Sequence, residues 1–130
     1  MRALVVDDSS TIRDIVGTVL NRSFGLEIVE ASNSAEALRQ PGPFDLVVTD
    51  LVMPEEHGFS LIRELRRRHE TRTVPILVIS VEVHPDVPEH AVQAGADRFL
   101  GKPFRLDQLT AVVREMLDLP PEAGQPPAPR

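Results

Sequence analysis

The sequence predicts an α/β protein built on a doubly wound sheet of five parallel strands. From residue 2 to about residue 118, apolar segments of strand length alternate with segments whose apolar residues recur at helical spacing. Short links join these segments, and several strand segments are apolar throughout, as in a sheet covered on both faces. With 130 residues, 42% of them apolar, the chain can bury one core without disulfides.

The first strand and helix lie at the start of the chain. Residues 2–7 are mostly apolar and predict a strand that ends on acidic residues. The polar cluster at 9–11 is a good helix cap, and after it apolar residues recur at helical spacing up to Leu20. Apolar and charged residues then alternate at 26–29, which predicts a second strand at an edge, half-exposed to water.

The middle of the chain contains the next two helices and one strand. Residues 34–40 predict a short helix, which the Pro-Gly-Pro sequence at 41–43 ends. The apolar segment 44–49 predicts the third strand. Apolar residues at helical spacing between Phe59 and Leu65 predict a third helix after it.

Two further units complete the pattern. Residues 75–79 are apolar and predict the fourth strand. Pro88 suits the first turn of a fourth helix, which Gly95 ends. Residues 97–100 predict a fifth strand, and the apolar spacing across 106–117 predicts the last helix.

This pattern favours the strand order 2-1-3-4-5, the flavodoxin-like (βα)5 arrangement with right-handed crossovers. The order leaves the alternating second strand at one edge. It places strands one and three where the strand order reverses, which is where open α/β sheets bind ligands. We expect one domain over residues 1–118. Residues 119–130 are rich in proline and cannot build a core, so we expect a disordered tail or the stub of a linker there.

Composition and charge exclude several classes of function. The chain has no cysteine, which excludes disulfides and thiolate metal sites. It has no signal-peptide pattern and no apolar stretch near the roughly 20 residues of a membrane span. The net charge of −6 disfavours direct binding to nucleic acid or to an anionic membrane. The arginines at 63–72 crowd a helix end, where we expect a solvated face. A cytoplasmic location is the default.

Charged residues follow the apolar runs of three of the predicted strands. Asp7 and Asp8 follow the first, Asp50 the third, and Lys102 the fifth. Lys102 is the only lysine among fourteen basic residues. Its use at this one position indicates that the position requires a compact ammonium. Taken singly, each acid has a structural reading, as a helix cap or a strand end. Their joint placement at one edge of the sheet favours a functional site.

Such a cluster has a definite chemistry. Carboxylates in one pocket repel one another, so they raise a pKa or recruit a cation. Oxygen-only ligands open to water favour Mg²⁺, with Mn²⁺ also possible. Once a divalent cation neutralises the cluster, one carboxylate can attack a phosphoryl group.

Four motifs together resemble the receiver domain of two-component response regulators. The resemblance covers residues 2 to about 118, and its motifs are Asp7-Asp8, Asp-Leu-Val-Met-Pro at 50–54 with Gly58, Ser80, and Lys102-Pro103-Phe104. Receiver domains take a phosphoryl group from a histidine kinase or a histidine phosphotransfer protein onto an aspartate. They then control a downstream output protein or a fused output domain.

The resemblance implies the roles of the acidic residues. Asp50 would be the phosphoacceptor. Asp8 and Asp50 would bind Mg²⁺ directly, together with the backbone carbonyl of Val52. Asp7 would act on the cation mainly through bound water.

The resemblance also implies which residues would contact the phosphoryl group and transmit its presence to the output surface. Lys102 would pair with one phosphoryl oxygen, and Ser80 would donate its hydroxyl to another. Phe99 matches the switch aromatic of the family, although a plain core phenylalanine is an equally good reading. The fourth helix, fifth strand and fifth helix would form the output surface. Val81 stands where receivers usually carry alanine or another small residue, and it could narrow access to Asp50.

Two other functions could also use an acidic pocket of this kind. A phosphorylation-independent interaction module would keep the acidic pocket and signal by docking alone. An aspartate-nucleophile phosphatase would also place an acid at a strand end. Such enzymes usually need a second acid two residues later and a cap segment, whereas position 52 is valine and the sequence offers no cap. Complete retention of the acceptor set argues against the docking module.

Overall fold

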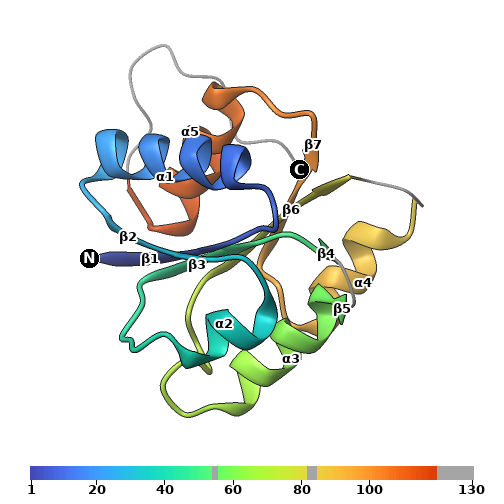
Figure 1. Cartoon of the computed structure of the whole chain (residues 1–130). Helices are drawn as coiled ribbons and strands as arrows, with labels where there is room; N and C mark the ends of the chain where they lie inside the picture. Colours follow the sequence, from blue (N-terminus) through green and yellow to red (C-terminus); the bar gives the residue numbers. More distant parts are fainter. Residues whose placement is uncertain (54–55, 82–84, 120–130) are drawn as a thin grey trace.

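A five-stranded parallel sheet runs through the middle of the molecule (Figure 1). The structure is a computed structural model that describes residues 1–53, 56–81 and 85–119. The strands of the sheet are β1 (Arg2–Val6), β2 (Glu27–Ala31), β3 (Leu46–Thr49), β6 (Ile76–Val81) and β7 (Arg98–Lys102). Their order is β2-β1-β3-β6-β7, which confirms the predicted order 2-1-3-4-5 and the flavodoxin-like fold.

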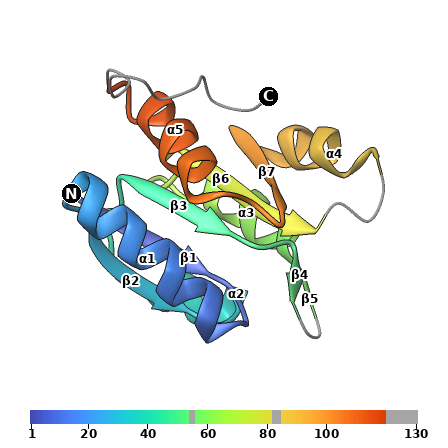
Figure 2. The ribbon, with the colours of Figure 1, turned by 90° about the horizontal axis from the view of Figure 1, so that it is seen from above.

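Helices cover both faces of this sheet, as the view from above shows (Figure 2). One face carries α1 (Ser10–Phe24) and α5 (Leu106–Met116), and the other carries α2 (Ser34–Arg39), α3 (Gly58–Arg67) and α4 (Val87–Ala94). Because successive strand residues point to opposite faces, each strand feeds two cores. Val5 of β1 packs with Leu20 under α1 and α5, whereas Leu4 packs with Ile62 on the other side.

The predicted elements are confirmed, with shifts of a few residues at their ends. Ser9 caps α1 by accepting a hydrogen bond from the Ile12 amide at 3.3 Å, and β2 is half-exposed as an edge strand should be. Gly95 ends α4 with a φ of 124°, a conformation that favours glycine. Both β6 and β7 run further than predicted, because their parallel pairing continues until Val81 faces Lys102.

A short antiparallel pair follows β3 and is absent from the sequence prediction. It consists of β4 (Val52–Met53) and β5 (Glu56–His57). Two-residue strands are too short to produce a periodic signal, so sequence reasoning treats this segment as a loop.

The C-terminal tail and the absence of a membrane span are the two remaining expectations from the sequence. Of the predicted tail at 119–130, residues 120–130 lie outside the described residues, so the tail and the domain boundary at 118 stay predictions. Within the part of the chain that the structure describes, no helix combines the length and the hydropathy needed to span a membrane.

The expectation of a solvated arginine face at 63–72 is wrong for one residue, Arg66 of α3. Its side chain is only 21% exposed, and its Nη2 pairs with Asp97 at 2.9 Å. The guanidinium also donates to four backbone carbonyls, those of Thr71, Arg72, Val74 and Gly95, at 2.6 to 3.2 Å. The same Asp97 oxygen accepts from the Ile76 amide at 2.8 Å. Arg66 therefore joins α3 to the start of β6 and to the end of α4.

Candidate functional site

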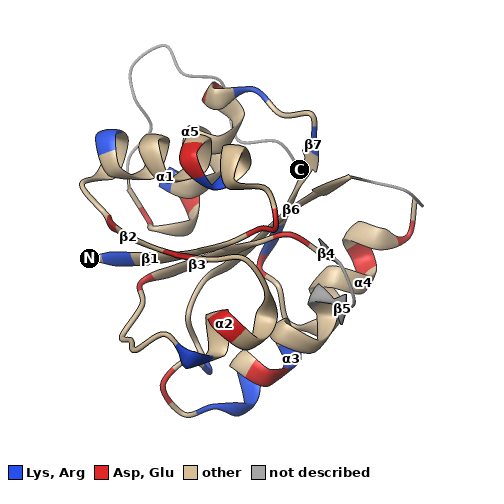
Figure 3. Ribbon diagram, viewed as in Figure 1, with Lys and Arg blue, Asp and Glu red and all other residues tan. Residues whose placement is uncertain are grey.

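Three acidic side chains meet at the carboxyl ends of β1 and β3. The two strands are paired with Val6 beside Thr49, so the residues that follow, Asp7 and Asp50, emerge side by side. Asp7 is 3% exposed and Asp50 6%, whereas Asp8 is exposed. One carboxylate oxygen from each of the three lies within 4.8 Å of the other two. Figure 3 shows this acidic edge in red where the two strands end.

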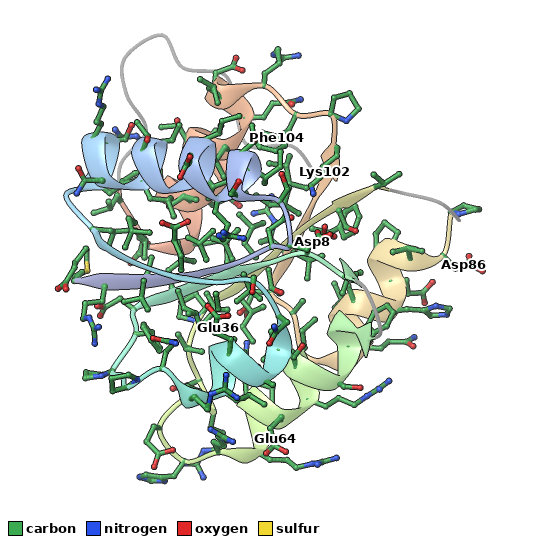
Figure 4. The ribbon with its side chains drawn as sticks, in the orientation of Figure 1. Asp8, Glu36, Glu64, Asp86, Lys102 and Phe104 are labelled. Carbon is green, nitrogen blue, oxygen red and sulfur yellow. The ribbon has the colours of Figure 1, made fainter. Side chains whose placement is uncertain are left out.

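Lys102 brings a positive charge into the same pocket from the end of β7. Its Nζ lies 3.0 Å from Asp7 Oδ2 and 3.1 Å from Asp50 Oδ2, and its side chain is 17% exposed. In Figure 4, Lys102 and Asp8 lie at the same end of the sheet. The ammonium thus bridges the two buried carboxylates from a single compact nitrogen.

The Asp50 carboxylate is held on both oxygens. Oδ1 accepts hydrogen bonds from the Ser80 hydroxyl and from the Leu51 amide, each at 2.7 Å, while Lys102 contacts Oδ2. Ser80 is fully buried on β6, the strand next to β3. Charge-assisted hydrogen bonds of this kind orient a carboxylate firmly.

Asp7 and Lys102 shift each other's ionisation. Burial raises the pKa of Asp7, and the nearby charge of Asp50 adds to this rise; the Ser9 amide, at 2.9 Å, and Lys102 oppose it without cancelling it. Burial alone would lower the pKa of Lys102, but its hydrogen bonds to Asp7 and Asp50 and their negative charges outweigh burial and raise that pKa. The ammonium therefore stays charged in the pocket.

The donor set suits a hard divalent cation. Three carboxylates face one ammonium, so the cluster keeps a net negative charge. The Asp8 carboxylate is open to water and has no hydrogen-bond or ion-pair partner among the described residues. Every candidate ligand atom is oxygen, the ligand that Mg²⁺ and Mn²⁺ prefer. The acidic triad is therefore of the kind that binds magnesium.

The structure brings together five of the residues singled out from the sequence, namely Asp7, Asp8, Asp50, Ser80 and Lys102. Val52 begins β4 two residues after Asp50, and the role of its carbonyl stays a prediction. Phe99 lies on β7, half-buried against the core under α3 and α4. It therefore fits its core reading, and its switch role also stays a prediction.

Sequence reasoning missed one residue that contacts this site and the acid that pairs with it. Arg13 of α1 donates from Nη1 to the backbone carbonyl of Asp7 at 2.6 Å, and its Nε pairs with Glu30 of β2 at 3.0 Å. The only signal is a charged residue beside apolar helix positions, which ordinarily indicates a solvated face. No pattern in the sequence shows that such an arginine reaches back to a strand end.

Comparisons with known proteins agree with this geometry. The family described as the response regulator receiver domain matches residues 3–114. The chain is 35% identical to the chemotaxis protein CheY-3 of Vibrio cholerae over 121 residues, which cover 91% of this chain and 89% of that protein. It is 31% identical over 119 residues to the phosphate regulon transcriptional regulatory protein PhoB of Escherichia coli, covering 89% of this chain and 51% of PhoB.

A solved structure shows the same fold. The chemotaxis response regulator CheY4 of Vibrio cholerae aligns with a TM-score of 0.81 at 31% identity, covering 88% of this chain and 97% of that chain. The acidic pocket and its lysine lie where the topology of such a fold binds ligands. The chain thus belongs to the response regulator receiver domains, signalling phosphoacceptors of two-component systems rather than conventional enzymes.

Proposed function

We propose that Asp50 is the phosphoacceptor of this receiver domain and that a phosphohistidine is its donor. One observation carries this assignment. Among the three acids, Asp50 is the one whose carboxylate contacts both the Lys102 ammonium and the Ser80 hydroxyl. These are the two groups able to stabilise the oxygens of an incoming phosphoryl group, so a phosphoryl group on Asp50 would meet both of them.

The reaction is an in-line displacement at phosphorus. A carboxylate oxygen of Asp50 forms a bond to phosphorus while the bond from phosphorus to the donor's imidazole nitrogen breaks. The imidazole keeps that electron pair and is protonated. Lys102 pairs with one phosphoryl oxygen and Ser80 donates to another, so developing charge is met by groups already in place. Water later attacks phosphorus, the bond from phosphorus to the Asp50 oxygen breaks, and inorganic phosphate leaves as the Asp50 carboxylate is restored.

Mg²⁺ is the proposed cofactor, with Mn²⁺ as a substitute. Asp8 and Asp50, with the backbone carbonyl of Val52, would bind it directly, and Asp7 would act mainly through bound water. The contacts support this division, because Asp7 is already engaged by Ser9 and Lys102, whereas the exposed Asp8 faces water. A bound cation neutralises the carboxylates and offsets charge on the phosphoryl oxygens.

Phosphorylation would shift a pre-existing equilibrium at the surface formed by α4, β7 and α5. Ser80 and Phe99 are the proposed switch residues. They lie on the paired strands β6 and β7, where Ser80 faces Gly101 and Val78 faces Phe99. A displacement of Ser80 on phosphorylation would therefore be transmitted to the strand that carries Phe99.

The partners follow from the family. A two-component receiver implies a kinase, and we propose a histidine kinase or a histidine phosphotransfer protein as the donor. The output is a downstream protein or a fused output domain. A cytoplasmic location stays a prediction from a sequence that has no cysteine and so needs no oxidising compartment.

Mass spectrometry tests the assignment. The protein incubated with Mg²⁺ and acetyl phosphate, or with a cognate kinase, should gain one phosphoryl group. The gain should be absent in Asp50→Asn and in excess EDTA, and retained in the control Asp14→Asn, which removes an exposed acid from α1. A wild-type protein that gains no phosphate from either type of donor would instead support the docking-only module.

A further inference from the structure

An ion pair lies beside the acidic pocket. Arg13 of α1 and Glu30 of β2 approach to 3.0 Å, with side chains 17% and 46% exposed. Arg13 also donates to the Asp7 carbonyl at 2.6 Å. The neighbour of Glu30 on β2, Ala31, accepts a hydrogen bond from the Asp7 amide at 3.1 Å. β2 therefore holds both backbone groups of Asp7, the amide directly and the carbonyl through Arg13.

These contacts fix the peptide that joins Asp7 to Asp8. A peptide unit is planar, so holding its carbonyl sets the direction in which the next residue leaves. The Asp7 side chain has its own partners, Ser9 and Lys102. The Asp8 carboxylate has none within the described parts of the chain. The position of Asp8 consequently depends on its backbone. The Arg13 guanidinium holds the peptide before Asp8, and the Asp7 carboxylate holds the Ser9 amide after it.

We propose that Arg13, braced by Glu30, is a positioning residue for the divalent cation, because it orients the Asp7–Asp8 peptide so that the Asp8 carboxylate faces Asp50. This inference rests on the proposed function of the pocket. Arginine suits the task, since its separate N–H groups reach a carbonyl and a carboxylate at the same time. Residues that hold metal ligands in place without touching the metal typically contribute about 10- to 100-fold to metal affinity.

The direction in which cation affinity changes when Arg13 is removed distinguishes a positioning role from a purely electrostatic one. Arg13 is a cation near a cation site, so its charge alone opposes binding. Removing it would tighten binding if only charge mattered. If Arg13 positions Asp8, its removal weakens binding. The double variant Arg13→Gln/Glu30→Gln keeps the net charge of the wild type and isolates the loss of the contacts.

The experiment is calorimetric titration with Mn²⁺, repeated with Mg²⁺, at fixed ionic strength. Arg13→Gln should bind about tenfold more weakly, the low end for such partners. The charge-matched double variant should be weakened to a similar degree, and Arg13→Lys should not restore wild-type affinity. Arg22→Gln, which removes an exposed charge from the same helix, should bind at least as tightly as the wild type.

A second variant keeps the proposal testable if Arg13→Gln fails to fold. Urea unfolding in EDTA identifies the variants that remain folded, and Glu30→Gln leaves the Arg13 donor in place while removing its brace. Its affinity should fall further than that of Glu27→Gln, which removes a charge from the same strand away from Arg13. Wild-type affinity in a folded Arg13→Gln, or equal losses in the two glutamate variants, would overturn the positioning role alone. Failure of the wild type to bind either cation would overturn the proposed cofactor as well.

Discussion

The Ser80 hydroxyl donates a hydrogen bond of 2.7 Å to the Asp50 carboxylate across a separation of 30 residues. The pairing of β3 with β6 brings them together, and both residues are buried. Ser80 is therefore in contact with the proposed phosphoacceptor in this structure. It need not travel from a distant position to meet a phosphoryl group on Asp50.

Ser80→Ala should lower the free energy of unfolding by about 1–2 kcal/mol, because the buried Asp50 carboxylate loses one of its donors. Urea denaturation measures this change. The matched control is Ser10→Ala at the exposed start of α1, which should change stability by less than about 0.5 kcal/mol. Equal stabilities of the two variants would show that the hydroxyl does not support the carboxylate.

Asp7 should make stability depend on pH in the absence of divalent cations. Burial raises its folded pKa above the ordinary 3.8, so the folded state holds this proton more tightly than the unfolded state does. The resulting stabilisation is present below pH 3.8 and is lost as the pH rises through the higher folded pKa. Asp7→Asn removes this dependence.

Urea unfolding in EDTA between about pH 3.5 and pH 7 tests whether the stability contributed by Asp7 falls as the pH rises. The free energy of unfolding of Asp7→Asn, relative to the wild type, should increase with pH across this window. Asp14→Asn, an exposed acid on α1, should show no comparable trend. A difference between Asp7→Asn and the wild type that stays constant with pH would contradict the raised pKa.

Divalent cations should stabilise the folded protein, because the acidic cluster exists only when β1 and β3 are paired. At a Mg²⁺ concentration 100 times the dissociation constant, the gain should be about 2.7 kcal/mol. Asp8→Asn removes the exposed ligand and should lose most of this gain, while Asp14→Asn should keep it. Thermal unfolding against Mg²⁺ concentration provides the measurement. The same Mg²⁺ gain in Asp8→Asn and the wild type would place the cation elsewhere.

The sheet and the acidic pocket are predictable from the sequence for one physical reason. Carboxyl ends of parallel strands share an edge, so a charged residue directly after an apolar run is placed as soon as the strand order is known. Asp7, Asp50 and Lys102 all follow this rule, and the structure brings them within hydrogen-bonding distance. Ser80 could be placed only through the motifs around it, since a serine at a strand end has no distinctive signal.

Contacts between side chains and distant backbone groups could not be predicted. Arg66 donates to carbonyls of the segments before β6 and β7, and Arg13 donates to the carbonyl at the end of β1. Both look like exposed helix residues in the sequence, because the pattern of apolar residues contains no information about backbone acceptors. The β4–β5 pair was missed because its strands are shorter than any detectable period.

Arg66→Lys tests the first of these contacts. A lysine keeps the charge but cannot donate to several carbonyls and to Asp97 at once, so partly buried carbonyls lose their partners. The free energy of unfolding should fall by about 2–3 kcal/mol, measured by urea denaturation. The control is Arg67→Lys, one residue along α3, where the side chain is 72% exposed and makes a 3.7 Å ion pair. That change should cost less than about 0.5 kcal/mol. A loss no larger than that in Arg66→Lys would return Arg66 to the solvated face that the sequence predicts.

Val81 stands where the resemblance to receiver domains leads us to expect a small residue, and we predict that it affects the phosphorylation rate. Its side chain is 49% exposed at the end of β6, paired in register with Lys102. It also lines an apolar groove that runs past Lys102 to Phe104. We predict that a branched side chain at this rim narrows the approach of a small donor to Asp50. Val81→Ala should therefore speed phosphorylation by acetyl phosphate.

A barrier lowered by about 1 kcal/mol corresponds to a rate roughly five times higher, which is the increase we expect. A time course followed by mass spectrometry at saturating Mg²⁺ measures it. Val92→Ala is the control, since Val92 is 53% exposed on α4 and does not line this groove. If access to Asp50 limits the rate, Val81→Ala should be phosphorylated faster than the wild type and Val92→Ala should not. Equal rates in Val81→Ala and the wild type would mean that Val81 leaves the approach to Asp50 open.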